Sequence, residues 1–168
     1  MTYSRGRLEL MTPSPRHEKR KSLLVNLLGD YLLEREIDYE QGGSTTFQDA
    51  ALEQGLEPDD CFWLGSLSAL RGQEDAASRP DLVIEIEVSH SAMNRLPLFL
   101  QMGVPEVWRY TPEGRLVVHA LLDGEYRVVE SSPTLPELPL PDLGLHMALG
   151  REQGALAARR SWRQLLRS

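Results

Sequence analysis

The chain has 168 residues, of which 41% are hydrophobic and 26% charged, with a formal net charge of −7. This length fits one domain with a sizeable core, and the acidic balance argues against tight non-specific binding to nucleic acid. Cys61 is the single cysteine, which excludes an intrachain disulfide and a cysteine zinc cluster. No apolar run is long enough to span a bilayer and the first residues lack the apolar segment of a secretory signal, so we expect a cytoplasmic protein with no membrane partner.

The charge is distributed unevenly along the chain. Residues 1–22 and residues 151–168 each carry a net charge of +4, so the middle is strongly acidic. The two basic ends either form a cationic rim around an acidic centre or are two solvated helix faces.

The N-terminal region predicts a short edge strand followed by a long helix. Arg7–Met11 alternates weakly, which is typical of a strand at a sheet edge. Ser14 is a good N-cap and Pro15 suits the first helical position, so a helix is expected from about residue 15 to residue 35. Its apolar stripe has helical spacing and consists of Leu24, Leu27, Leu28, Tyr31 and Leu32.

The next stretch predicts extended segments joined by turns. Ile37–Gln41 and Thr45–Phe47 flank a glycine-rich turn and are expected to form a hairpin. Residues 48–56 are polar and are expected to be irregular, residues 57–64 form another strand, and residues 66–78 form a loop.

The stretch from Arg79 to Ser89 predicts the central strand. Because strand side chains alternate, one face is aliphatic and consists of Leu82, Ile84, Ile86 and Val88. The other face carries Asp81, Glu85 and Glu87. Buried carboxylates must be paired, hydrogen-bonded or bound to a metal. A one-sided antiparallel sheet with the acids in water gives the same alternation, so both alternatives stay open.

The rest of the chain predicts further helices and strands. They are expected, in chain order, as a helix at 94–102, strands at 106–110, 115–122 and 125–129, and helices near 142–149 and 151–166. Asn94 and Gly103 are suited to start and end the first of these helices. Asp123-Gly124 is a strong two-residue hairpin signal. The element order predicts an α/β (α+β) fold with a mixed sheet flanked by helices.

Two Pro-Asp steps precede strands, at Pro58-Asp59 and Pro80-Asp81, and the second leads to Glu85-Ile86-Glu87. A carboxylate from one strand with an acidic pair on the next is a divalent-metal arrangement, because Mg²⁺ prefers hard oxygen ligands and keeps several waters. Spacing alone is a weak signal for such a site.

From about Arg7 to Leu149 the chain resembles the bacterial putative restriction endonuclease family of the PD-(D/E)XK nuclease superfamily. The resemblance rests on segments spread along the chain, namely residues 7–13, His17, and residues 43–47, 57–60, 80–85, 94–97 and 103–110.

The resemblance implies a restriction-endonuclease-like domain over residues 1–150, followed by a basic C-terminal helix or tail over residues 151–168. By position, Asp59 matches the motif aspartate and Glu85 the motif glutamate. Glu87 falls where the superfamily places a lysine, which would orient the attacking water and offset developing charge. Glutamate cannot supply positive charge, although it can ligate an ion or act as a base.

Replacement cations would then come from Lys19 or Lys21 on the first helix, or from Arg95 after the central strand. His17 and Glu18 are expected near the acidic strand, with His17 as a further catalytic candidate. The alternative is that both are ordinary first-turn residues, where a glutamate suits the helix dipole.

Together these features predict a metal-dependent endonuclease that hydrolyses DNA, in which Asp59 and Glu85, assisted by Glu87, hold Mg²⁺ or Mn²⁺. The alternative is a catalytically silent nuclease fold that serves as a binding or assembly module. A glycosidase requires two opposed acids across a cleft, which acids on one strand do not suggest. A homodimer is expected, because the segment at Thr45–Phe47 and the hairpin at Asp123-Gly124 leave sheet edges that need covering.

Overall fold

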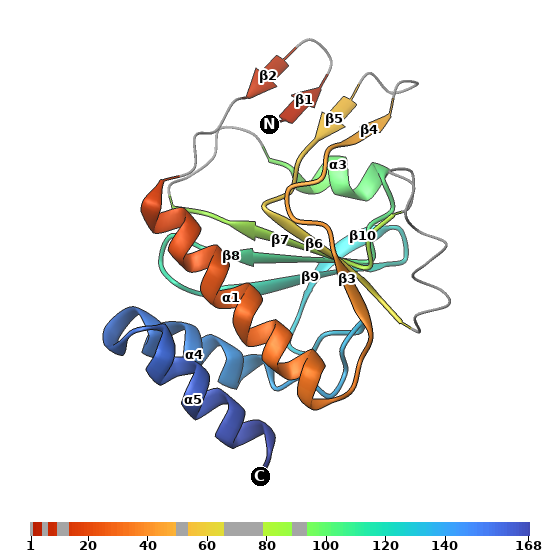
Figure 1. Ribbon diagram of the computed structural model, residues 1–168. Coiled ribbons are helices and arrows are strands. Elements are labelled where there is room, and N and C mark those ends of the chain that lie inside the picture. The colour runs from red at the N-terminus through yellow and green to blue at the C-terminus, as the bar shows by residue number, and fades with distance from the viewer. Residues whose placement is uncertain (1, 5–6, 10–13, 50–53, 66–78, 89–93) are drawn as a thin grey trace.

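The computed structural model describes residues 2–4, 7–9, 14–49, 54–65, 79–88 and 94–168 (Figure 1). Its helices are α1 (Pro15–Glu34), α3 (Leu96–Gln101), α4 (Leu140–Gln153) and α5 (Ala155–Leu166). The larger sheet contains, in spatial order, β10 (Glu125–Val129), β9 (Leu116–Leu122), β8 (Glu106–Tyr110), β7 (Leu82–Ile86), β6 (Asp60–Leu64) and β3 (Tyr39–Gln41). The smaller sheet contains β2 (Arg7–Glu9), β1 (Thr2–Ser4), β5 (Gln54–Leu56) and β4 (Phe47–Asp49).

The larger sheet is mixed, as the sequence predicts. β7 and β8 run parallel, whereas the other neighbouring strands pair antiparallel. A parallel pair requires a crossover connection, and the segment that contains α3 supplies it. The predicted mixed sheet flanked by helices is therefore confirmed.

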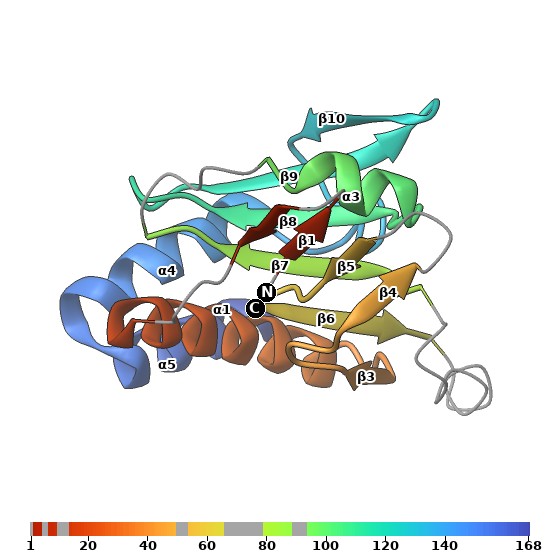
Figure 2. The same cartoon turned by 90° about the horizontal axis from the view of Figure 1, so that it is seen from above.

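The two faces of the larger sheet are covered by different elements. Leu82, Ile84 and Ile86 pack in one core cluster with residues of α1, α4 and α5. Val83 belongs to a second cluster, which includes residues of α3 and Phe47 of the smaller sheet. Figure 2 shows this layering, with α1, α4 and α5 on one side of the sheet and α3 on the other. The predicted alternation of β7 is thus confirmed.

The first helix begins and ends close to the predicted positions. The Ser14 side chain accepts a hydrogen bond from the His17 backbone N–H at 3.2 Å, and Pro15 occupies the first turn. The predicted leucine stripe is fully buried against the sheet. This cap fixes where α1 starts and therefore where His17 lies.

Two predictions between residues 37 and 56 are wrong. Ile37–Gln41 and Thr45–Phe47 do not pair, because β3 pairs with β6 and β4 pairs with β5 in the other sheet. Gly42 continues the pairing of β3 with β6: its N–H donates to the Cys61 carbonyl at 2.9 Å, and a Cβ there would lie 2.6 Å from the Trp63 ring. Residues 48–56, expected to be irregular, contribute to β4 and β5. The predicted loop at 66–78 lies outside the described residues.

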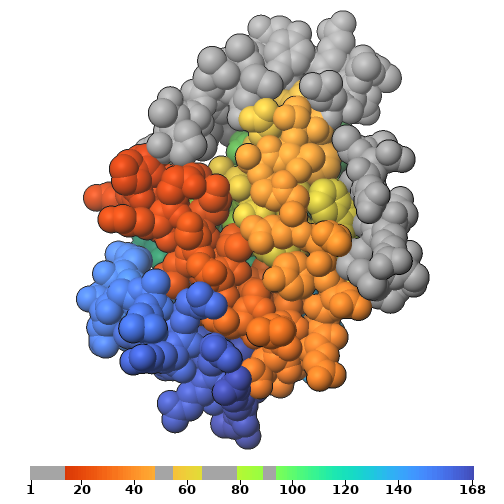
Figure 3. Space-filling model, in the orientation of Figure 1, coloured from red at the N-terminus to blue at the C-terminus, as the bar shows by residue number. Residues whose placement is uncertain are grey.

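The C-terminal strands and helices agree with the prediction. Asp123 and Gly124 have φ values of 52° and 83°, as the two-residue turn between β9 and β10 requires. α5 is a helix whose Ala158 and Trp162 are fully buried in the core cluster with α1. Figure 3 shows α4 and α5 (blue) directly against α1 (orange-red). None of the described helices combines the length and hydropathy needed to cross a membrane.

Candidate active site

The site residues gather where the start of β6 meets the end of β7. These strands are antiparallel, so Asp59, just before β6, comes next to Ile86 at the end of β7. Its Oδ2 atom accepts the Ile86 backbone N–H at 2.6 Å and lies 2.9 Å from Nε2 of His17. The expectation that the start of the first helix lies at the acidic strand is confirmed.

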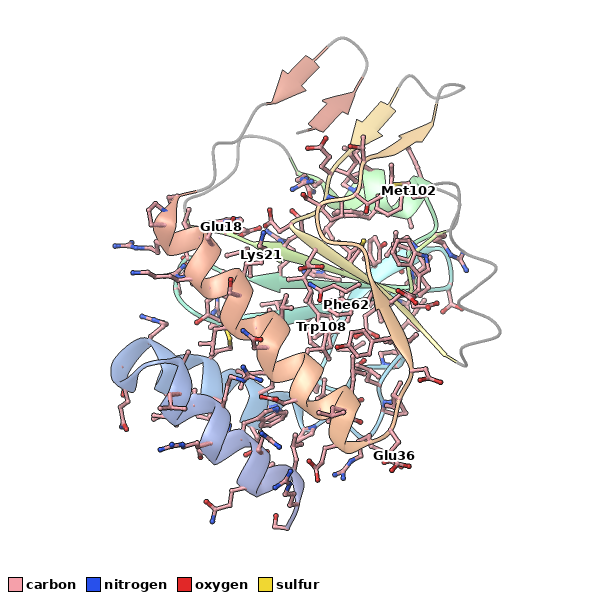
Figure 4. The ribbon with its side chains drawn as sticks, in the orientation of Figure 1. Glu18, Lys21, Glu36, Phe62, Met102 and Trp108 are labelled. Atoms are coloured by element: carbon pink, nitrogen blue, oxygen red, sulfur yellow. The ribbon has the colours of Figure 1, made fainter. Side chains whose placement is uncertain are left out.

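His17 is buried, with 3% of its surface exposed, and is held from both sides. Its Nδ1 atom lies 3.0 Å from Oε1 of Glu18, whose other oxygen pairs with Lys21 at 3.0 Å. The hydrogen bond to Asp59 raises the pKa of His17 despite the opposing effect of burial. Figure 4 shows Glu18 and Lys21 on the N-terminal half of α1, the half nearer the end of β7.

Glu85 is the buried carboxylate of the site, with 7% of its surface exposed. Its Oε2 accepts from Nη1 of Arg95 at 2.5 Å, and Arg95 also donates to the Glu57 carbonyl. Its Oε1 is buried without a hydrogen-bond partner within the described part of the chain. Burial raises the pKa of Glu85 to about 8; Arg95 opposes this shift, and the charge of Asp59 reinforces it.

Glu87 is held by arginines. Its Oε1 accepts from both Nε and Nη2 of Arg109, at 2.8 and 2.5 Å. Its carbonyl accepts from Nη1 of Arg20 on α1 at 3.2 Å, and its N–H donates to the Tyr110 carbonyl at 2.8 Å. Within the described residues, no three His, Cys, Asp or Glu side chains are grouped so as to hold a metal ion.

The profile of the family described as "Uma2: Putative restriction endonuclease" matches residues 1–150. The chain belongs to the Uma2 family. The match covers the same residues as the nuclease-like domain expected from the sequence, and the predicted resemblance is confirmed. Among curated proteins, the chain matches none.

The fold has a counterpart among solved structures. The crystal structure of a putative nuclease belonging to DUF820 from Anabaena variabilis superposes with a TM-score of 0.60 over 87% of this chain and 90% of that one. The two sequences are 15% identical, so the likeness shows the fold. This fold likeness agrees with the restriction-endonuclease-like core expected for a Uma2 member.

The three side chains predicted to supply positive charge have different surroundings. Arg95 contacts Glu85, Lys21 pairs with Glu18, and Lys19 is exposed on α1. Of the three, only Arg95 is in direct contact with a predicted motif carboxylate.

Sequence reasoning missed Arg109 and Arg20. A signal for Arg109 exists, because β7 and β8 pair in parallel with Glu85 opposite Arg109, so these two residues share a sheet face. Using it requires the pairing register, which the separate strand patterns do not contain. No comparable signal exists for Arg20, which reaches the end of β7 from a helix.

Restriction endonuclease-like families generally use divalent metals, and the donors here fit such an ion. The unpartnered buried Oε1 of Glu85 is a hard oxygen ligand, and the nearby charge of Asp59 adds a second carboxylate. Glu87, also predicted as a ligand, is bonded to Arg109. A hydrated ion held by two carboxylates satisfies the preference of Mg²⁺ for retained waters.

Proposed function

We propose that the chain is a divalent-metal-dependent endonuclease that hydrolyses phosphodiester bonds in DNA. The observation that carries the proposal is the Oε1 atom of Glu85, a buried carboxylate oxygen without a partner among the described residues, on a chain of the Uma2 family. A buried carboxylate oxygen with no donor is costly unless a cation binds it.

The site residues have different roles in the proposed reaction. Asp59 and Glu85 hold Mg²⁺ or Mn²⁺, which supplies a bound water of lowered pKa and stabilises charge on the phosphate. His17 fixes the orientation of Asp59 through the 2.9 Å contact and is close enough to exchange a proton with a water at that carboxylate. Arg95 keeps Glu85 in place and supplies the positive charge that position 87 does not.

Calorimetric titration with Mn²⁺ tests the metal site. Wild type is expected to bind the ion and to cleave plasmid DNA in its presence, whereas Glu85→Gln is expected to lose both, because the amide keeps the volume but not the charge. Glu125→Gln, an exposed carboxylate on β10, serves as the matched control and is expected to behave as wild type. Equal Mn²⁺ binding by wild type and Glu85→Gln, or none by either, contradicts the proposed site.

A catalytically silent binding or assembly module is the second candidate. One observation supports it: each predicted acid contacts a basic side chain of the protein. Asp59 contacts His17, Glu85 contacts Arg95 and Glu87 contacts Arg109. Such a module does not require the metal, so the same titration separates the two functions.

We also propose a homodimer. Phe47, from the first segment expected to need covering, belongs to β4, and the Asp123-Gly124 hairpin contains β10. Both strands are edge strands of their sheets, and Val128 on β10 is 66% exposed. Light scattering at micromolar concentration is expected to give twice the mass of the chain, and Val128→Lys on the β10 edge is expected to give the monomer. A monomeric mass for wild type rules the dimer out.

A further inference from the structure

Arg109 lies beside the proposed metal ligands, on the same face of the sheet. It is the register partner of Glu85 on the neighbouring parallel strand, and adjacent strands are about 4.8 Å apart. Glu85 is bonded to Arg95, whereas Arg109 is bonded to Glu87, two residues further along. The face therefore carries two separate ion pairs. One contains Glu85, a proposed metal ligand, and the other contains Glu87.

The guanidinium of Arg109 is anchored through one edge. Both of its hydrogen bonds within the described residues go to the same atom, Oε1 of Glu87. The Arg109 side chain is 34% exposed and the Glu87 side chain 20%. A guanidinium has more N–H groups than this contact uses, in a planar arrangement that matches phosphate oxygens. The remaining edge of Arg109 is thus suited to an anion from solution.

His119 adds a second polar group to this face. It lies opposite Val107 on β8, and residues directly opposite in an antiparallel pair share a face, which here is the face of Arg109. His119 is 8% exposed, and its Nε2 atom is buried without a partner in the described part of the chain. Burial and then the charge of Arg109 lower the pKa of His119.

A surface ion pair without function is the rival explanation, and the chain contains one for comparison. Arg127 on β10 donates through Nε and Nη2 to Oε1 of Glu125, at 3.1 and 2.8 Å, with side chains 51% and 66% exposed. Such exposed pairs contribute little to stability. The Arg109 pair has the same two-donor geometry but is more buried and adjoins Glu85, Arg20 and His119.

We propose that Arg109 binds a backbone phosphate of DNA next to the Asp59–Glu85 carboxylates, and that Glu87 is a positioning residue that holds Arg109. The proposal rests on the proposed nuclease function and assigns Glu87 a role other than metal ligation. The positive charge missing at position 87 is then supplied on the neighbouring strand as well as by Arg95.

Fluorescence anisotropy with a short labelled DNA duplex tests the subsite. The full chain is titrated in EDTA, so that no cleavage occurs, over a series of KCl concentrations. Arg109→Gln is expected to weaken binding several-fold. It is also expected to make the plot of log K against log salt less steep, by the amount that corresponds to about one phosphate contact. Arg127→Gln, the same change at the comparison pair, is expected to leave the slope unchanged. Arg109→Lys, which keeps the charge, is expected to retain the slope with weaker binding.

Glu87→Gln separates positioning from metal ligation. If Glu87 positions Arg109, Glu87→Gln is expected to weaken DNA binding in EDTA. Its Mn²⁺ binding in calorimetry is expected to stay as in wild type. Loss of Mn²⁺ binding with unchanged DNA affinity would overturn the assignment. Thermal melting of each variant verifies that it is folded.

The outcomes distinguish this subsite from the nuclease function. An unchanged salt slope in Arg109→Gln, with wild type that cleaves DNA, overturns the subsite alone. A reduced slope with wild type that cleaves nothing in Mn²⁺ supports the subsite and overturns the nuclease. Absence of any DNA binding by wild type overturns both.

Discussion

Glu85→Gln is expected to make the metal-free protein more stable at pH 8 and to leave its stability at pH 5 nearly unchanged. Burial raises the pKa of Glu85 from 4.5 to about 8, so the folded state keeps a proton that the unfolded chain releases. Glutamine has no proton to lose, and its Oε1 can still accept from Arg95. The substitution therefore removes the pH-dependent cost of this side chain and retains its hydrogen bond.

The sign of the pH dependence follows from proton binding. Below pH 4.5 both states of wild type are protonated at Glu85, and the contribution of this side chain to stability is highest. Between pH 4.5 and about 8 the unfolded state binds fewer protons than the folded state, so the free energy of unfolding decreases as pH rises. The total decrease is on the order of a few kcal/mol, because one unit of pKa shift corresponds to about 1.4 kcal/mol.

Urea denaturation at pH 5, 6.5 and 8 measures this effect. Wild type and the exposed Glu125→Gln control are expected to lose stability in parallel, and Glu85→Gln to lose less. Mn²⁺ added at pH 8 is expected to stabilise wild type by mass action and not Glu85→Gln. Parallel curves for all three proteins would show that Glu85 does not carry a raised pKa.

The local signals in the sequence were sufficient for most elements. The Ser14 cap and the leucine stripe define α1, and Asp123-Gly124 defines the turn of the β9–β10 hairpin. The alternation along β7 separates the aliphatic face from the acidic one. In each case the structure is decided by residues close together in the chain, which a single sequence shows.

The contacts that could not be predicted depend on distant pairing. β3 and β4 do not form a hairpin, because β3 pairs with β6 and β4 with β5, both of which come later in the chain. The contact between His17 and Asp59 joins residues 42 positions apart, and the pair formed by Glu87 and Arg109 requires the parallel register of two strands. Residue spacing was sufficient to predict the acidic residues of the site. Their hydrogen-bond partners are apparent only once the strands are paired.

The contacts of residues 151–168 with the domain also depend on pairing between residues that are distant in the chain. The sequence predicts a basic helix or tail over residues 151–168 but does not predict what it contacts. In the structure, Arg159 of α5 donates to both oxygens of the buried Asp30 at 2.8 Å. α5 thereby covers α1, the helix that carries His17 into the site.

Trp162→Ala is accordingly expected to destabilise the whole domain by about 3–5 kcal/mol. The Trp162 side chain is fully buried, its Nε1 donates to the Leu27 carbonyl of α1 at 2.7 Å, and its ring lies 5.2 Å from that of His146. Alanine leaves a cavity between α5 and α1 and removes this donor. Urea denaturation at pH 7 measures the loss as a lower transition midpoint.

Two variants define what the Trp162→Ala result means. Leu156→Ala lies in the same helix at a side chain that is 65% exposed, and is expected to change stability by less than about 0.5 kcal/mol. Trp162→Phe keeps most of the apolar volume and is expected to lie between the two. If Trp162→Ala unfolds at the same midpoint as Leu156→Ala, α5 is a dispensable tail. If it unfolds early in a single transition, residues 151–168 belong to the domain that holds the site.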